Sequence, residues 1–186
     1  MSNKVLVPIA HGTEEIEAVS IIDVLRRAGA DVTVAAVGGQ LEVKASRGVS
    51  LVANRYIQGC TNERFGLIAL PGGAEGAENL RDSKELAEML KHQDKNNNYI
   101  GAICASPAVV LLHHEILRNR KATCYPKYAA KLENQEAVNE RVVVDQNIIT
   151  SQGPGTALEF SITLVKLLFD EARAQEVGEA LIMQGA

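Results

Sequence analysis

The sequence predicts an α/β fold in which helices cover both faces of a mostly parallel β-sheet. Three observations lead to this prediction. Short apolar runs alternate with amphipathic segments along the 186 residues, which is the pattern of repeated strand–helix units. The runs are apolar at successive positions, as expected of strands buried on both faces. Several runs also end in a short polar or glycine-rich turn that leads into a helix. A chain of this length suits one domain, which we predict for residues 1–186.

The strands are predicted from the apolar runs. In chain order they are residues 5–10, 31–37, 65–70, 99–103, 121–126, 141–145 and 147–151. Between the second and third strands, residues 41–53 (LEVKASRGVSLVA) indicate a small hairpin around Ser46–Gly48.

The helices are predicted from amphipathic spacing and from their end signals. In chain order they are residues 14–29, 82–94, 106–117, 156–170 and 172–183. Gly29 closes the first helix, and Pro107 stands at a permitted first-turn position of the third. Two starts resemble capping boxes, in which a polar residue pairs with a glutamate three positions later. These are Asp82 with Glu85, and Thr156 with Glu159.

Composition argues against several classes of function. The net charge of −4 and pI near 5.6, without a basic block, argue against nucleic acid and anionic membranes as partners. No apolar run is long enough to cross a bilayer, and the first residues lack the form of a signal peptide. Three cysteines at unrelated spacings argue against a disulfide framework and against a zinc site. We therefore expect a cytoplasmic protein.

Four of the predicted strands run directly into a helix through a short turn. These turns are His11–Thr13, Pro71–Gly73, Cys104–Ser106 and Gln152–Gly155. The carboxyl ends of parallel strands meet at one edge of a sheet, where open α/β folds bind their ligands. The sequence therefore predicts a functional site at this edge.

Cys104 is the candidate nucleophile in this row of turns. Ala102 and Ser106 flank it at the two positions where a sharp nucleophile-bearing turn requires small residues. A helix that begins at Ser106 directs its positive end at the sulfur, which lowers a thiol pKa. The alternative is a small buried thiol, since free cysteines are among the most buried residues.

Glu17 is the candidate acid–base partner. With Ile21, Val24 and Ala28 it forms one row on the first helix, so its carboxyl is expected to face inward while Glu14 and Glu15 stay solvated. A partly buried carboxyl has a raised pKa and can exchange protons near neutral pH. The alternative is a capping or salt-bridged glutamate.

Two further features of this edge remain open. The glycines Gly72 and Gly73 allow backbone N–H groups to approach a ligand oxygen, although Pro-Gly-Gly is also a common turn. Cys124 is either a resolving thiol or a plain strand cysteine, and Cys60 lies in a polar loop without a motif. Of the four histidines, only His11 lies on this edge. His92, His113 and His114 are expected on the surface or at the border of the core.

Five segments together resemble, in order and spacing, the ThiJ/PfpI superfamily, and within it the branch of the Parkinsonism-associated protein deglycase and bacterial YajL. The segments are EEIEAVSIIDVLRRAGADVTVA, SRGV, LPGGAEGAENLRDS, AICASPAVVL and TSQGPGTALEF. The resemblance covers essentially the whole chain. It implies a flavodoxin-like sandwich, a homodimer, and an activity that needs no metal and no organic cofactor.

The resemblance also implies roles for residues. Cys104 is the nucleophile, Glu17 shares a proton with it, and Gly72, Gly73 and Ala105 form the anion pocket. Candidates for the pocket wall or its polar network are Arg47, His11, Tyr125, Gln152 and Pro154.

The chain departs from the superfamily at three positions. Tyr125 replaces a histidine of the animal members, and Gln152 replaces an arginine, which makes the anion pocket less positive. Ala105 stands where the protease-like branch has a histidine, so we expect no peptidase activity.

These expectations lead to two functional hypotheses. The first is a cysteine-dependent deglycase and glutathione-independent glyoxalase for methylglyoxal-type dicarbonyls and their adducts with amines and thiols. The second is a redox-sensing, chaperone-like dimer whose functional event is oxidation of Cys104. An amidotransferase-like hydrolase would need a histidine partner that the sequence does not supply.

Overall fold

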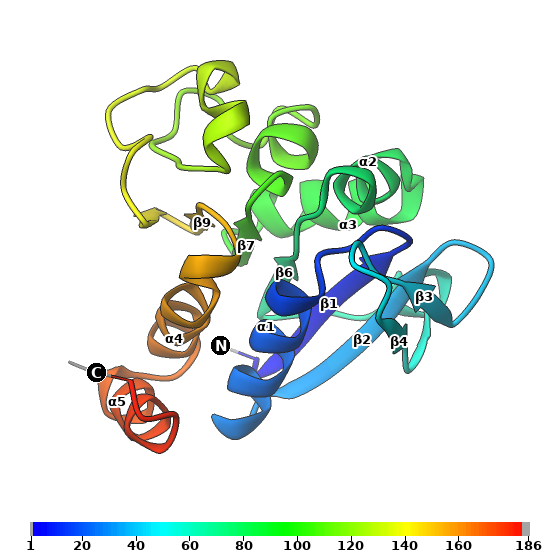
Figure 1. Cartoon of the computed structure of the whole chain (residues 1–186), viewed down its shortest axis with the longest axis horizontal. Coiled ribbons are helices and arrows are strands. Elements are labelled where there is room, and N and C mark those ends of the chain that lie inside the picture. The colour runs from blue at the N-terminus through cyan, green and yellow to red at the C-terminus, as the bar shows by residue number, and fades with distance from the viewer. Residues whose placement is uncertain (1, 184–186) are drawn as a thin grey trace.

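The central element of the fold is a seven-stranded sheet (Figure 1). Its strands have the order β5-β2-β1-β6-β7-β9-β8. The structure is a computed structural model that describes residues 2–183. All neighbouring strands are parallel except β8 and β9. The strands are β1 (Lys4–Ala10), β2 (Asp31–Val37), β5 (Arg55–Tyr56), β6 (Leu67–Leu70), β7 (Tyr99–Ile103), β8 (Val142–Asp145) and β9 (Ile148–Ser151). A separate antiparallel hairpin joins β3 (Glu42–Lys44) to β4 (Ser50–Val52).

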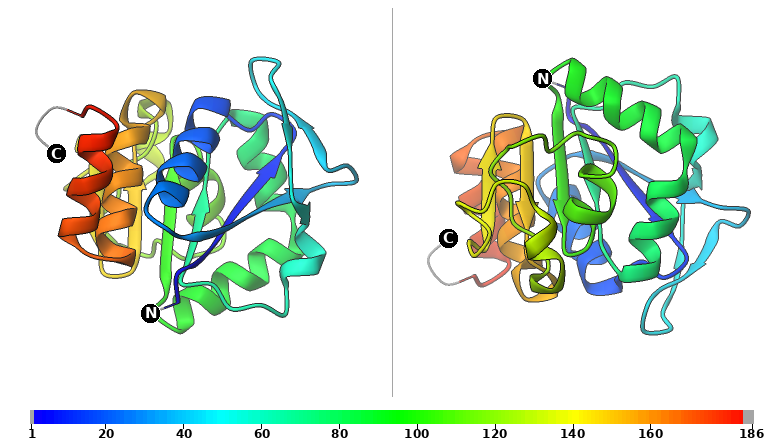
Figure 2. Two further views of the ribbon diagram at one scale, coloured as in Figure 1. Left: turned by 90° about the horizontal axis from the view of Figure 1, so that it is seen from below. Right: turned by 90° about the horizontal axis from the view of Figure 1, so that it is seen from above.

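Helices cover both faces of this sheet, as Figure 2 shows. The helices on one face are α1 (Glu15–Arg27), α4 (Ala157–Leu168) and α5 (Glu171–Ala180). Those on the other face are α2 (Ala74–Asp82) and α3 (Lys84–Lys95). The sheet with helices on both faces confirms the predicted fold class.

The strands separate two hydrophobic cores. In β1, Val5, Val7 and Ile9 belong to the core beneath α1 and α4, whereas Leu6 and Ala10 belong to the core beneath α2 and α3. This explains why the runs are apolar at successive positions, because both faces of each inner strand are removed from water. No helix within residues 2–183 is long and apolar enough to cross a membrane.

The four turns at the ends of strands lie as predicted. They follow β1, β6, β7 and β9, which are adjacent in the sheet and parallel to one another. Their carboxyl ends therefore meet at one edge, with Cys104 near the middle of the row.

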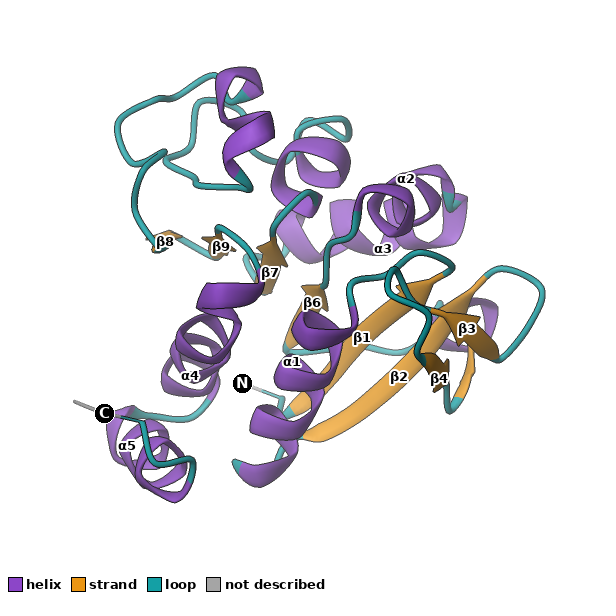
Figure 3. Cartoon of the chain, viewed as in Figure 1, coloured by secondary structure: helices purple, strands orange, loops and turns teal. Residues whose placement is uncertain are grey.

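The long segment between β7 and β8 differs from the prediction (Figure 3). Within the predicted helix 106–117, Pro107–Leu111 forms a single π-helical turn (η2). Glu115 has a positive φ of 60°, which stops a continuous helix over these residues. The predicted strand 121–126 is absent because its backbone finds no ladder partner. The N–H of Thr123 instead donates to the side chain of Thr150, at 2.9 Å. This segment also contains the 3₁₀ helix η3 (Pro126–Lys131).

The first predicted capping box is wrong because a helix was missed. Asp82 ends α2, which begins directly after Gly73, and its carboxylate pairs with Arg81 at 2.7 Å. The cap of α3 is Ser83, whose hydroxyl accepts from the N–H of Leu86 at 3.2 Å. Few apolar residues lie in α2, so its sequence alone carries little helical signal.

The second predicted capping box is also wrong. The hydroxyl of Thr156 accepts from the N–H of Gly153 at 3.1 Å, within the 3₁₀ turn η4 (Pro154–Thr156) that precedes α4. Glu159 pairs with Arg141 at 2.7 Å instead of reaching back to the helix start. A third 3₁₀ turn, η1 (Ile57–Cys60), buries Cys60 completely, which corrects its expected place in a polar loop.

Candidate active site

Cys104 lies on the sharp turn that follows β7. Its φ of +64° is in the left-handed region, which costs a residue with a side chain about 1 kcal/mol or more. Neighbouring backbone holds this conformation, because Cys104 donates to the carbonyl of Ser151 at 2.9 Å and accepts from the N–H of Tyr125 at 2.7 Å. The hydroxyl of Ser106 donates to the carbonyl of Pro71 at 2.6 Å and ties this turn to the one after β6.

Glu17 lies directly beside this turn, in the first turn of α1. Its side chain is fully buried, together with Ile21 and Val24 of the predicted inward row. Oε2 accepts from the N–H of Gly72 at 2.7 Å, whereas buried Oε1 has no partner within residues 2–183. An inward-facing carboxyl is what the helical spacing predicted.

Gly72 packs against both Cys104 and Glu17. A Cβ at this position would lie 2.6 Å from the Cβ of Cys104 and 2.8 Å from Oε2 of Glu17. Both contacts are shorter than atoms of this kind tolerate, so the approach of the two functional side chains requires glycine here.

The two functional groups shift each other's ionisation. Burial raises the pKa of Glu17 from 4.5 to about 7, the N–H of Gly72 opposes this, and the charge of Glu14 adds to it. Burial, followed by the charge of Glu17, raises the pKa of Cys104 to about 12, although N–H groups of Gly73 and Ala105 donate to the sulfur. Of the two groups, the carboxyl therefore ionises first, and the thiol keeps its proton at neutral pH.

The expectation that the following helix lowers the pKa of the Cys104 thiol is thus wrong. Cys104 is only 9% exposed, and the helix after it is a single π-turn. Removal of water raises the pKa of this thiol more than a short helix start lowers it. The sulfur can lose its proton readily only if Glu17 accepts that proton.

A cavity of about 610 Å³ opens in front of Cys104. Gly73 and Ala105 lie at its base, and its wall comes from the hairpin tip, η3 and the turn after β9. The predicted residues that line it are Arg47, Tyr125 and Pro154. Sequence reasoning missed Tyr128 and Lys127, which follow the predicted edge residue Tyr125 but carry no motif.

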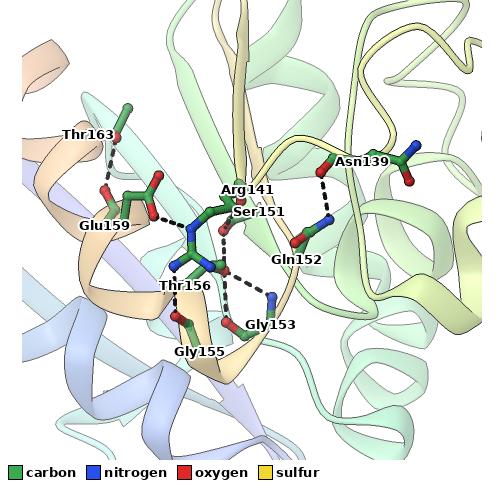
Figure 4. Close-up of polar contacts among 9 residues, drawn as sticks. All are labelled: Asn139, Arg141, Ser151, Gln152, Gly153, Gly155, Thr156, Glu159 and Thr163. Carbon is green, nitrogen blue, oxygen red and sulfur yellow. Dashed lines mark hydrogen bonds and ion pairs between the residues drawn. The ribbon is translucent and has the colours of Figure 1, made fainter.

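Of the five residues predicted for the pocket wall or its polar network, two do not line the cavity. His11 is one of them, and its Nε2 lies 3.7 Å from Oε1 of Glu75. Gln152 turns its side chain away, and its amide donates to the carbonyl of Asn139 at 3.2 Å (Figure 4).

The first turn of α1 corrects the expectation that Glu14 and Glu15 are solvated. Glu15 is 8% exposed, and its carboxylate accepts from the hydroxyl of Ser46 and the N–H of Arg47, both at 2.9 Å. It thereby fixes the hairpin tip against α1. Glu14 caps the helix by accepting from the N–H of Glu17 at 2.8 Å, a role that its position three residues before Glu17 could have indicated.

The other two cysteines are fully buried. Burial raises the pKa of Cys124 to about 11, and its sulfur contacts the carbonyl of Tyr125 at 3.5 Å. Within residues 2–183, no group of three or more His, Cys, Asp and Glu side chains could hold a metal ion. The groups described above at this edge are one nucleophile, one proton acceptor and two N–H donors.

Comparisons with known proteins match nearly the whole chain. A model described as the DJ-1/PfpI family matches residues 3–167. Protein DJ-1 homolog B of Arabidopsis thaliana is 47% identical over 180 residues, which are 97% of this chain and 41% of that protein. This chain thus spans less than half the length of that relative.

Two further matches cover most of this chain. A Caenorhabditis elegans protein named glutathione-independent glyoxalase DJR-1.2 is 37% identical over 160 residues, 83% of this chain and 82% of that protein. The solved structure of oxidized Toxoplasma gondii DJ-1 superimposes with a TM-score of 0.95 at 46% sequence identity. The match covers 97% of this chain and 98% of the Toxoplasma chain.

Proposed function

Because this chain belongs to the DJ-1/PfpI family, we propose that it is a cysteine-dependent enzyme for methylglyoxal-type dicarbonyls and their early adducts. In this role it is a glutathione-independent glyoxalase and a deglycase that counters carbonyl stress. The observation that carries the proposal is the pairing of the buried carboxyl of Glu17 with Cys104, which lines an open cavity. The name of the glyoxalase relative in Caenorhabditis elegans supports the substrate class.

The first step joins the sulfur to the aldehyde. The thiol of Cys104 adds to the aldehyde carbon of methylglyoxal while its proton passes to the carboxylate of Glu17, whose Oε1 is free to accept it. The aldehyde oxygen becomes an alkoxide beside the N–H groups of Gly73 and Ala105, which already point at the sulfur. Glu17 returns the proton to this oxygen, which leaves a neutral hemithioacetal.

The second step moves hydrogen between the two carbons. Ionised Glu17 removes the proton from the former aldehyde carbon, the electron pair moves onto the ketone oxygen, and Glu17 returns the proton to that oxygen to give a neutral enediol. Glu17 then takes the proton from the hydroxyl on the former aldehyde carbon and delivers it to the former ketone carbon, which gives a lactoyl thioester on Cys104. Water then cleaves the carbon–sulfur bond, which releases lactate and restores the thiol. The pKa of about 7 for Glu17 suits repeated transfer in both directions.

Deglycase activity uses the same two groups. In an amine adduct of methylglyoxal, the former aldehyde carbon carries a hydroxyl and the amine nitrogen. The sulfur of Cys104 forms its bond to this carbon as the carbon–nitrogen bond breaks, and the amine leaves with the thiol proton through Glu17. The resulting hemithioacetal continues to lactate.

The proposal is tested by lactate formation from methylglyoxal without glutathione. We expect turnover by the wild-type protein, no turnover by Cys104→Ser, and a loss of about 100-fold or more in Glu17→Gln. Cys60→Ala is the control, because this thiol is buried in η1 away from the cavity. An inactive wild-type protein, or full activity in either site variant, would contradict the proposed enzymatic activity.

A kinetic comparison separates the two activities. If a preformed amine adduct disappears no faster than it releases methylglyoxal spontaneously, only the free dicarbonyl is a substrate. Adduct loss that exceeds the spontaneous release rate requires direct attack on the adduct.

We also propose that the enzyme works as a homodimer in the cytoplasm. Exposed apolar side chains gather on α1 and the hairpin, where Ile16 is 56%, Val19 48% and Val52 71% exposed. Glu15 ties the hairpin tip to α1, so a second copy would cover both together. Sedimentation of the wild-type protein and of Val52→Lys and Val19→Glu tests this, and we expect a dimer that the two substitutions weaken. A wild-type protein that sediments as a monomer, or variants that dimerise as well as the wild type, would contradict the proposal. The three free thiols favour a reducing compartment.

A second candidate function is redox sensing by a chaperone-like dimer. The observation that favours it is that Cys104, of the three cysteines, lines the cavity and is 9% exposed, whereas Cys60 and Cys124 are fully buried. The sulfur would attack one peroxide oxygen, release water and become a sulfenic acid. Mass spectrometry under mild peroxide tests this function, because a Cys104 no more oxidised than Cys60 would rule it out.

A further inference from the structure

The turn after β9 forms the wall of the cavity that covers Glu17. Pro154 lines the cavity, and Gly153 is buried behind it. A Cβ on Gly153 would lie 3.3 Å from the ring of Tyr125 and 4.0 Å from Oε1 of Glu17. The position of this turn therefore decides how closely the unpartnered oxygen of Glu17 is enclosed.

One side chain from outside the cavity fastens this turn (Figure 4). Arg141, which directly precedes β8, binds Oε2 of Glu159 through Nε at 2.7 Å and donates from Nη2 to the carbonyl of Gly155 at 3.0 Å. Its carbonyl accepts from the hydroxyl of Ser151 at 2.8 Å. Arg141 thus joins the end of β9, the turn and α4.

The other end of the turn has its own internal support. The hydroxyl of Thr156 lies 2.6 Å from that of Ser151 and 3.1 Å from the N–H of Gly153. These bonds hold Gly153 but not Gly155, whose carbonyl is bound by Arg141. A lysine at position 141 could reach only one of the two partners, because it lacks the planar fork of arginine.

We propose that Arg141 is a positioning residue, which acts through its bonds to Glu159 and Gly155 to hold the Gly153–Gly155 turn closed over Glu17 and Cys104. The inference rests on the proposed function only in treating this cavity as the active site.

The exposure of Arg141 helps to separate positioning from general stability. Its side chain is 58% exposed and that of Glu159 45%, and ion pairs of this kind contribute little to the free energy of unfolding. Loss of the pair should therefore leave the protein folded while the turn moves. Displacement of an active-site wall by about 1 Å is enough to disturb a reaction strongly.

The test measures how fast iodoacetamide alkylates Cys104, with the modified peptide quantified by mass spectrometry. This readout does not depend on any dicarbonyl activity. We expect Arg141→Met and Glu159→Gln to raise the alkylation rate about fivefold. A change of this size corresponds to the loss of one hydrogen bond of ordinary strength. Arg141→Lys should give a smaller increase. Arg173→Met is the matched control, because it breaks an exposed ion pair with Glu176 on α5.

The pH dependence of alkylation adds a readout that general loosening would not give. Glu14 and Cys104 are the titratable groups that act on Glu17. Water admitted by an open turn lowers the pKa of Glu17 below about 7, so the pH profile should move to lower pH in Arg141→Met and stay in place in Arg173→Met.

The outcomes distinguish this inference from the proposed function. Wild-type alkylation rates in folded Arg141→Met and Glu159→Gln would overturn the positioning role, as would an equal increase in Arg173→Met. If Arg141→Met does not fold, the alkylation rate of Cys104 in Glu159→Gln alone tests the positioning role. In an active enzyme, the Arg141 variants should raise KM more than they lower kcat. Faster alkylation of Cys104 in the Arg141 and Glu159 variants, together with a wild-type protein that forms no lactate, would refute the glyoxalase activity but support the positioning role of Arg141.

Discussion

Replacing Glu17 with glutamine tests the electrostatics of the site through protein stability. The amide has the shape of the carboxyl and keeps one oxygen to accept from the N–H of Gly72, but it cannot ionise. The substitution therefore removes a buried charge and leaves the packing beneath Cys104 in place.

The size of the effect follows from the pKa of Glu17. A pKa raised from 4.5 to about 7 corresponds to about 3 kcal/mol of free energy between the two ionisation states. The folded chain holds the proton more tightly than the unfolded chain. The stabilisation is therefore complete below pH 4.5 and is lost as the pH rises through about 7.

The assay is urea denaturation at a series of pH values from 5 to 8. We expect the free energy of unfolding of the wild-type protein to fall relative to Glu17→Gln by up to about 3 kcal/mol across this range. Other titrating groups contribute equally to both proteins and cancel in the difference.

Glu15→Gln is the matched control on the same helix turn. Burial raises the pKa of Glu15, but bonds from backbone N–H groups and from Ser46 outweigh it, so the pKa is lowered overall. Its stabilisation is present above the unfolded pKa and is lost in acid, so this control should show no such trend between pH 5 and 8. Parallel curves for wild type and Glu17→Gln would refute the raised pKa.

Three further predictions concern the packing around the site. Gly72→Ala places a Cβ 2.6 Å from the Cβ of Cys104. Lactate formation should therefore be lost, and denaturation should show a stability loss of about 1–3 kcal/mol. An active variant would contradict the requirement for glycine beside Cys104 and Glu17. Ser106→Ala leaves the buried carbonyl of Pro71 without its 2.6 Å bond and should cost about 1–3 kcal/mol in denaturant, whereas Ser20→Ala on the half-buried side of α1 should cost little. Gly101→Ala meets only the ends of the Leu164 and Phe160 side chains, at 3.0 Å, so its thermal destabilisation should be milder than that of Gly72→Ala, and an equal loss would show that these ends cannot move.

The sheet and the row of turns that forms the candidate site could be predicted from the sequence because their signals are local. Strands buried on both faces have continuous apolar runs, and the turns after β1, β6, β7 and β9 follow these runs directly. The inward position of Glu17 followed from helical spacing alone. These features depend on residues within a few positions of one another.

Local signals failed where contacts from elsewhere decided the structure. Both capping boxes were wrong because Asp82 belongs to a preceding helix and Glu159 binds Arg141. The segment 121–126 has the composition of a strand but no backbone partner in the sheet. Glu15 is buried because the hairpin tip, about thirty residues further along the chain, folds against it.

The sequence by itself thus determined the α/β class and the row of turns at one sheet edge, and together with the family resemblance it selected Cys104 and Glu17 as the candidate pair. Only the tertiary structure decided their ionisation, because burial reverses the expected effect of the short helix on the thiol. Only the tertiary structure connects Arg141 to the cavity, through Glu159 and the carbonyl of Gly155. A pKa and the position of a wall depend on atoms that the fold brings together, and no local pattern in the sequence records which atoms those are.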